Sequence, residues 1–109
     1  MPCPATAEPA AAAEARRQVL AALEACPASV DPDVGVLLAS DLVTDAILHE
    51  AGGSIALDVR CDRARLRVHV HGTSDPGQGL VLVAALSDEW GSYRTPWSRA
   101  TYFTLTSRR

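Results

Sequence analysis

The chain has 109 residues and contains no lysine, so that its ten basic residues are all arginines. Aromatic residues make up only 5% of it. No apolar run approaches the roughly 20 residues that a membrane-spanning helix needs, which argues against a membrane partner. The N-terminus also lacks the basic segment followed by an apolar core that marks a signal peptide. We therefore expect a cytoplasmic protein.

Cysteine is scarce as well. The three cysteines, Cys3, Cys26 and Cys61, are odd in number and too far apart to form a CxxC pair. This spacing argues against a disulfide framework and against a structural zinc site, and it favours buried thiols or a cysteine in the N-terminal tail. A net charge of -3 gives the domain no general attraction for nucleic acid.

Hydrophobic residues make up 48% of the chain and are mainly alanine, valine and leucine, which is typical of a globular domain. The length suffices for a single modest core. Residues 1–9, rich in proline and alanine, are expected to form a disordered leader. Residues 10–109 are expected to form one domain.

Hydrophobic periodicity predicts a helix over residues 10–25 and a second helix that begins at Pro32, is capped by Asp31 and ends before Gly52. Alternating residues 54–61 and 66–71 predict an antiparallel hairpin. A third helix is expected over residues 79–90, too apolar for anything but burial, followed by a hairpin of residues 90–94 and 99–106. This order predicts an α+β fold, a two-layer sandwich with a mostly antiparallel sheet and helices on one face.

The second predicted helix carries two acids and a histidine on one face. Asp41, Asp45 and His49 are spaced at i, i+4 and i+8 in an otherwise apolar segment. Because an unpaired buried carboxylate is costly, acids on a buried helix should face a partner, a metal, water or a ligand cavity. The three residues therefore predict a pocket wall, and the two acids should titrate as a coupled pair.

The same segment, residues 41–49, resembles a motif of the anti-sigma-factor serine kinases in the GHKL (histidine-kinase-like) ATPase superfamily. That motif reads Glu-Leu-Val-Thr-Asn-Ala-x-x-His, and this chain reads Asp-Leu-Val-Thr-Asp-Ala-Ile-Leu-His. The resemblance implies the Bergerat ATPase fold, with Asp41 at the general-base position, Asp45 at the Mg²⁺-ligand position and His49 in the nucleotide site. Both acids differ from the family's Glu and Asn.

The resemblance continues through residues 66–74, which are similar to the family's Leu-Arg-Val-x-Val-x-Asp-x-Ser strand. Gly72 stands where the family has the aspartate that binds adenine. Only four residues separate Gly72 from Gly77 and Gly79, which with Leu80 match the Gly-x-Gly-Leu at the end of the family's ATP lid, so the lid is nearly deleted. The glycine pair also fits a second interpretation, a tight turn into a buried helix. Residues 98–105 resemble the family's last strand.

These changes favour a degenerate kinase-like regulatory domain that acts by protein–protein binding, with ATP binding weak or lost and no cofactor. The resemblance implies a sigma factor or an anti-anti-sigma protein as partner, and a possible homodimer. The alternative is an active anti-sigma-factor kinase that uses Mg-ATP with atypical site residues. A third interpretation is a metal-dependent enzyme that uses the acid stripe.

Two surface features also bear on partners. Trp97 follows Pro96 at an expected turn tip, which makes it a candidate for protein contact. The outer face of the first hairpin is basic, because Asp58 is outnumbered there by Arg60, Arg65, Arg67, His69 and His71. No aromatic residues are interleaved along this strip and the domain is acidic, so a solvated sheet face or an acidic protein partner is favoured over nucleic acid.

Overall fold

The computed structural model describes residues 7–25, 29–49, 55–73, 80–96 and 99–107. Within these ranges the helices are α1 (Ala7–Glu24), α2 (Pro32–His49) and α3 (Val81–Leu86). The strands are β1 (Ala56–Cys61), β2 (Arg65–Thr73), β3 (Glu89–Arg94) and β4 (Arg99–Thr106). The order of elements is the one that the sequence predicts.

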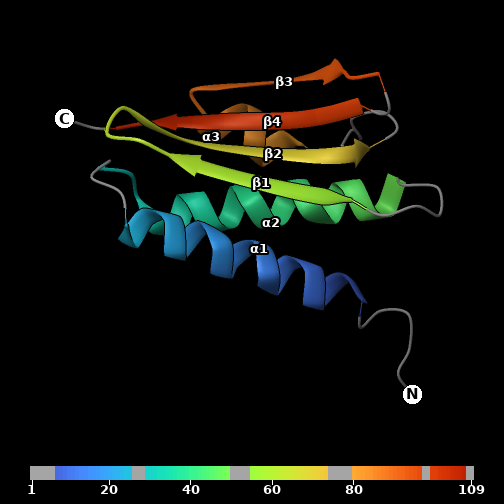
Figure 1. Ribbon diagram of the computed structural model, residues 1–109, viewed down its shortest axis with the longest axis horizontal. Helices are drawn as coiled ribbons and strands as arrows, with labels where there is room; N and C mark the ends of the chain where they lie inside the picture. Colours follow the sequence, from blue (N-terminus) through green and yellow to red (C-terminus); the bar gives the residue numbers. More distant parts are fainter. Residues whose placement is uncertain (1–6, 26–28, 50–54, 74–79, 97–98, 108–109) are drawn as a thin grey trace.

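The four strands form one sheet in the order β1-β2-β4-β3, and every neighbouring pair is antiparallel. In Figure 1, α1 and α2 run along one side of the strands. Residues of α3 belong to the same buried cluster as residues of α1 and α2. The helices therefore share one face of the sheet, and the prediction of an α+β domain with an antiparallel sheet is confirmed.

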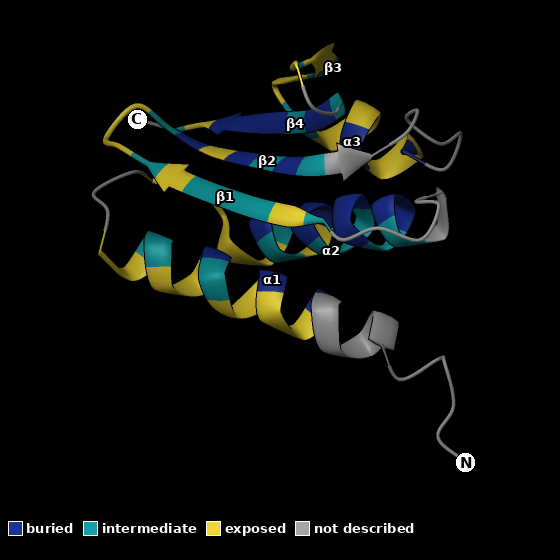
Figure 2. Cartoon of the chain, turned by 45° about the vertical axis from the view of Figure 1, so that its right-hand side comes forward, coloured by how far each residue is buried: buried dark blue, intermediate teal, exposed yellow. Residues whose placement is uncertain are grey.

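The core lies between the helices and the two central strands, β2 and β4. Leu66, Val68 and Val70 alternate along β2 and are fully buried, and Phe103 pairs with Val68 on β4. Figure 2 shows this buried band along β2, β4 and α2, with an exposed outer side on α1. The alternation leaves the residues between these positions on the opposite face of the sheet, which no described helix covers.

Local chemistry starts α2 and closes the first hairpin as expected. Asp31 caps α2, because its Oδ1 accepts a hydrogen bond of 2.9 Å from the N–H of Asp33. Asp62 turns the chain between β1 and β2, since its Oδ1 accepts hydrogen bonds from the N–H groups of Ala64 and Arg65 at 2.7 and 3.0 Å. These two bonds hold the pKa of Asp62 below its usual range.

A glycine lets α2 approach its neighbours closely. A Cβ atom at Gly35 would lie 3.2 Å from Leu66 Cδ2 on β2 and 3.4 Å from Val19 Cγ1 on α1. Both neighbours are fully buried. The missing side chain at Gly35 thus sets the spacing of α1, α2 and the sheet.

Three expectations about helix bounds and cysteine pairing differ from the structure. Helix α1 begins at Ala7, three residues before the predicted start, and the first six residues lie outside the described ranges. Helix α3 ends at Leu86 rather than at residue 90, because Glu89 and Trp90 pair with Thr104 and Phe103 in the sheet. The ladder hydrogen bonds of β3 therefore prevail over the helical pattern of the sequence.

The third difference concerns cysteine. Cys61 is disulfide-bonded, so the expectation of free thiols is wrong for this residue. The other two cysteines of the chain, Cys3 and Cys26, lie outside the described residues. Three cysteines cannot all be paired within one chain, but two of them can form one disulfide bond.

Candidate functional site

The two acids of the predicted stripe lie one turn apart on α2 and are both withdrawn from solvent. Asp45 is buried, with 9% of its surface exposed, and Asp41 is half-buried. The Oδ2 atom of Asp41 is fully buried and has no hydrogen-bond partner among the described residues. The neighbouring Ser40 Oγ is in the same state. Unsatisfied buried polar atoms are uncommon in folded proteins and point to a functional or strained position.

Burial raises the pKa of Asp41 above its ordinary value, and the negative charge of Asp45 raises it further. Both causes act against the ionised carboxylate. A general base must be ionised to accept a proton, and a raised pKa narrows the pH range in which Asp41 is ionised. Two acids one turn apart also repel the phosphates of a nucleotide unless a cation lies between them.

Gly72 lies at an irregularity near the end of β2. The pairing passes from His71 with Ala100 to Thr73 with Arg99, so Gly72 has no partner in the register, as the extra residue of a β-bulge would have none. Glycine is common at bulges because it adopts the unusual backbone conformations that they need. It offers no side-chain oxygen at the position where the GHKL resemblance places an adenine acceptor.

The structure describes only some of the other predicted site residues. Leu80 is buried and precedes the first residue of α3. His49 is the last residue of α2, and its side chain lies outside the described part of the structure. Gly77, Gly79 and Trp97 fall outside the described residues altogether. The structure therefore brings Asp41 and Asp45 together on α2, and it leaves the glycine pair and Trp97 unplaced.

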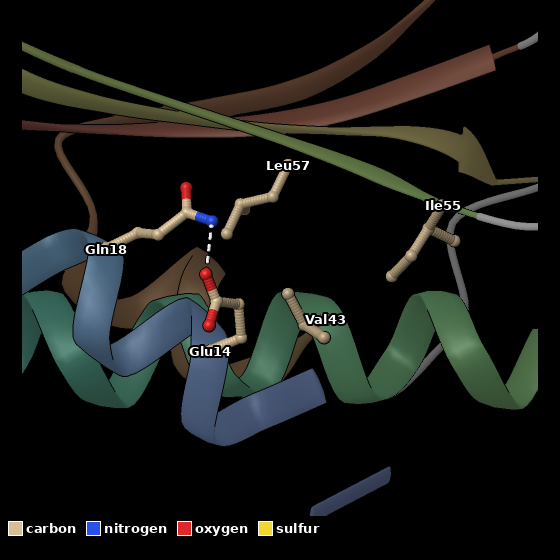
Figure 3. A pocket seen from close by; sticks show the side chains of 5 residues that line it. All are labelled: Glu14, Gln18, Val43, Ile55 and Leu57. Carbon is tan, nitrogen blue, oxygen red and sulfur yellow. Dashed lines mark hydrogen bonds between the residues drawn. The ribbon is translucent and has the colours of Figure 1, made fainter. Parts of the chain in front are cut away.

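Several cavities are lined by described residues, and two of them lie beside α1. One, of about 240 Å³, lies between α1, α2 and β1 and is lined by Glu14, Gln18, Val43, Ile55 and Leu57. Figure 3 shows that Gln18 and Glu14 project from α1 beneath Leu57, joined by a hydrogen bond of 2.9 Å. A second cavity, of about 370 Å³, is lined by Leu20, Leu23, Glu24, Val30 and Pro32. Neither cavity includes Asp41 or Asp45.

Within the described ranges, no group of three or more His, Cys, Asp and Glu side chains is placed to hold a metal ion. Two carboxylates on one helical face are fewer oxygen ligands than Mg²⁺ or Ca²⁺ takes, so water or a phosphate would have to complete the shell. The two carboxylates of α2 thus supply only part of the coordination shell that such an ion takes.

Sequence reasoning missed an apolar surface on α3 and β3. Helix α3 was expected to be buried, yet Val81 is 69% exposed and Leu82 is 41% exposed. Leu86 and Trp90 are exposed as well, and α3 lies against β3. Only Val83 of this helix is fully buried. Helix α3 has six residues and turns only one side toward the core, so its other apolar side chains lie in solvent. The short length of this helix could not be recognised from the sequence pattern, which predicts a helix up to residue 90.

No protein-family model matches the chain, and no curated protein matches its sequence. The resemblance to the GHKL kinases therefore rests on the motif residues themselves. In the part of the chain that the structure describes, no helix combines the length and the apolar character needed to cross a membrane.

Proposed function

We propose that this chain is a regulatory domain with the histidine-kinase-like (Bergerat) ATPase fold that acts by binding another protein, with ATP binding weak or lost. The observation that carries the proposal is the α3–β3 surface, defined as the exposed side chains of Val81, Leu82, Leu86 and Trp90. The order of elements and the antiparallel sheet with helices on one face agree with this fold.

The α3–β3 surface is unusual for a solvated face. Single exposed apolar side chains are normal on proteins, but several large ones gathered on adjoining elements mark a contact site. A tryptophan among them adds to the argument, because large aromatic side chains often dominate binding energy at interfaces. The partner suggested by the motif resemblance is a sigma factor or an anti-anti-sigma protein.

Three features argue against tight ATP binding. Gly72 has no side-chain acceptor for the adenine amino group. Asp45 replaces an amide by a carboxylate at the Mg²⁺ position, and the pKa of Asp41 is raised by burial and by Asp45. A buried donor left without its partner costs about 1–3 kcal/mol, so loss of the adenine acceptor alone should weaken binding roughly tenfold or more.

An active kinase is the second candidate, and one observation favours it. The buried Oδ2 of Asp41 has no hydrogen-bond partner among the described residues, and a bound ligand would supply one. Carboxylate oxygens are also the ligands that Mg²⁺ prefers. This candidate requires adenine to be held by other residues than Gly72.

Calorimetric titration with Mg-ATP separates the two candidates. The proposed function predicts no measurable heat of binding. A dissociation constant of about 1 μM, worth roughly 8 kcal/mol, would reject the loss of ATP binding and restore the kinase.

The protein-binding part is tested with a pair of leucine variants. Leu82 on α3 and Leu20 on α1 are 41% and 44% exposed, so Leu20→Ser is a matched control for Leu82→Ser. The variants would be tested for binding to purified sigma factors and anti-anti-sigma proteins. Leu82→Ser should weaken the complex at least about tenfold, and Leu20→Ser should not. Equal effects of both substitutions would show that the α3–β3 surface is not the contact site.

A further inference from the structure

The face of the sheet opposite the helices carries a cluster of aromatic rings from three strands. His69 on β2 stacks on Tyr102 of β4, with ring centroids 5.3 Å apart and planes inclined by 20°. Tyr93 of β3 meets His69 edge-on at 5.9 Å, and its hydroxyl lies 2.9 Å from His69 Nδ1. His71 stacks beside His69 at 6.3 Å. We call His69, His71, Tyr93 and Tyr102 the ring platform.

The strand register explains why the ring platform cannot be recognised from the sequence alone. The basic strip of the first hairpin contains no tyrosine, which argued against nucleic acid at the level of sequence. In the sheet, however, Tyr102 pairs with His69, and Ala100 pairs with both His71 and Tyr93. Aromatic side chains are therefore interleaved with the basic strip across strands rather than along one strand.

Arginines extend the ring platform along β2. A cavity of about 210 Å³ is lined by Arg65, Arg67, His69, Glu89, Tyr102 and Thr104. Arg67 is exposed, and Arg65 lies two residues beyond it on the same face. The face also holds two acids. Asp58 contacts Arg60 at 3.2 Å, and Glu89 accepts a hydrogen bond of 3.2 Å from the Tyr102 hydroxyl.

The platform is held by packing on the strands beneath it. A Cβ atom at Gly91 would lie 3.3 Å from Tyr102 Cε1, so the tyrosine ring covers the glycine backbone of β3. Burial lowers the pKa of His69, against the pull of Asp58. This shift favours the neutral form of the imidazole, which stacks on its neighbours without a charge.

We propose that this open face binds single-stranded nucleic acid, with bases stacked on the ring platform and backbone phosphates beside Arg65 and Arg67. Stacking of bases on aromatic side chains, combined with basic groups along the backbone, is the general chemistry of single-strand binding. Aromatic residues on the open face of a four-stranded sheet are also used for this purpose in RNA recognition. An acidic peptide would use the arginines but would have no need of four gathered rings. This inference is independent of the α3–β3 surface.

The test uses the full chain and a fluorescently labelled single-stranded oligonucleotide of roughly twelve nucleotides, with binding followed by anisotropy at several salt concentrations. Tyr93→Ala removes an exposed ring from the edge strand and should weaken binding about tenfold. Tyr93→Phe keeps the ring and should bind like the wild type. Arg67→Gln should weaken binding at low salt and reduce the salt dependence by about one counterion.

Arg16→Gln is the matched charge control, because Arg16 is an exposed arginine on α1, away from the open face. It should leave binding unchanged. Circular dichroism of each variant checks folding, and the comparison of Tyr93→Phe with Tyr93→Ala stands even where one arginine variant is unstable. Absence of binding at low salt, or equal binding by Tyr93→Ala, would overturn the proposal. A polyglutamate peptide that competes equally and is insensitive to Tyr93→Ala would instead identify an acidic-protein site.

Discussion

The Tyr93 hydroxyl and His69 Nδ1 lie 2.9 Å apart, although β3 and β2 are separated by β4. Ala100 of β4 pairs with both Tyr93 and His71 and is fully buried, so only a methyl group stands beside Tyr93 on the strand between β3 and β2. A larger residue at this position of β4 would crowd the ring of Tyr93.

This arrangement predicts a pH dependence of stability. Burial lowers the pKa of His69 below its ordinary value of 6.5. The unfolded chain therefore binds the proton more readily, and the free energy of unfolding should fall as the pH drops below 6.5 and continue to fall until the folded-state pKa is passed. Replacing His69 by Phe keeps a ring but removes the titration. Urea melts at about pH 7.5 and about pH 5 should show a smaller loss for His69→Phe than for the wild type. Parallel losses would place the pH dependence on other groups.

The acid pair of α2 predicts the opposite slope. Burial and the charge of Asp45 raise the pKa of Asp41, so ionisation of Asp41 becomes less favourable on folding. Stability contributed by the protonated form is lost as the pH rises from the ordinary value of 3.8 through the raised pKa. Asp41→Asn should therefore stabilise the domain, more at about pH 8 than at about pH 5. A stabilisation that does not change with pH would show that folding does not raise the pKa of Asp41.

Two valines of α3 provide a matched comparison of burial. Val83 is fully buried and Val81 is 69% exposed. Val83→Ala should destabilise the domain by about 2 kcal/mol, because two buried methyl groups are lost and a cavity remains. Val81→Ala should change stability by less than about 0.5 kcal/mol. Thermal or urea denaturation of both variants distinguishes them, and similar values would mean that α3 is packed differently.

Gly35 predicts the effect of overfilling the contact between α1, α2 and β2. Val has two more methyl groups than Ala, and the first added atom already lies 3.2 Å from Leu66 Cδ2. Gly35→Val should therefore destabilise by about 1–3 kcal/mol. In Gly35→Ala the gain in helix propensity, about 1 kcal/mol, should offset most of the crowding. A stable Gly35→Val variant would show that the helices can separate without loss.

Most of the fold could be read from local pattern. The cap at Asp31, the turn at Asp62 and the alternation of Leu66, Val68 and Val70 each act within a few residues, and the structure has all three. The end of α3 could not be read in this way. Glu89 and Trp90 continue the helical composition, and only pairing with Thr104 and Phe103 makes them a strand.

The candidate sites also differ in whether a local sequence pattern or the tertiary structure creates them. The partly buried acid pair of α2 follows from helical spacing, which is a local property. The ring platform depends on which strands are neighbours, and the α3–β3 surface depends on how much of a short helix the sheet can cover. Neither property is present in any short stretch of sequence. The nucleotide-site roles of Asp41, Asp45 and Gly72 remain predictions from the resemblance.

The sheet order has a further consequence for motion. Strand β3 is hydrogen-bonded to β4 on one edge only, and among the described elements it otherwise meets chiefly the short helix α3. Few buried side chains hold this α3–β3 unit, since Val83 is the one buried residue of α3 and most of β3 is exposed or half-buried. Amide hydrogens of β3 should thus exchange with solvent through local opening long before those of β2. A protein that docks on α3 and β3 would quench this opening, so its binding would be visible as slowed exchange of β3 amides.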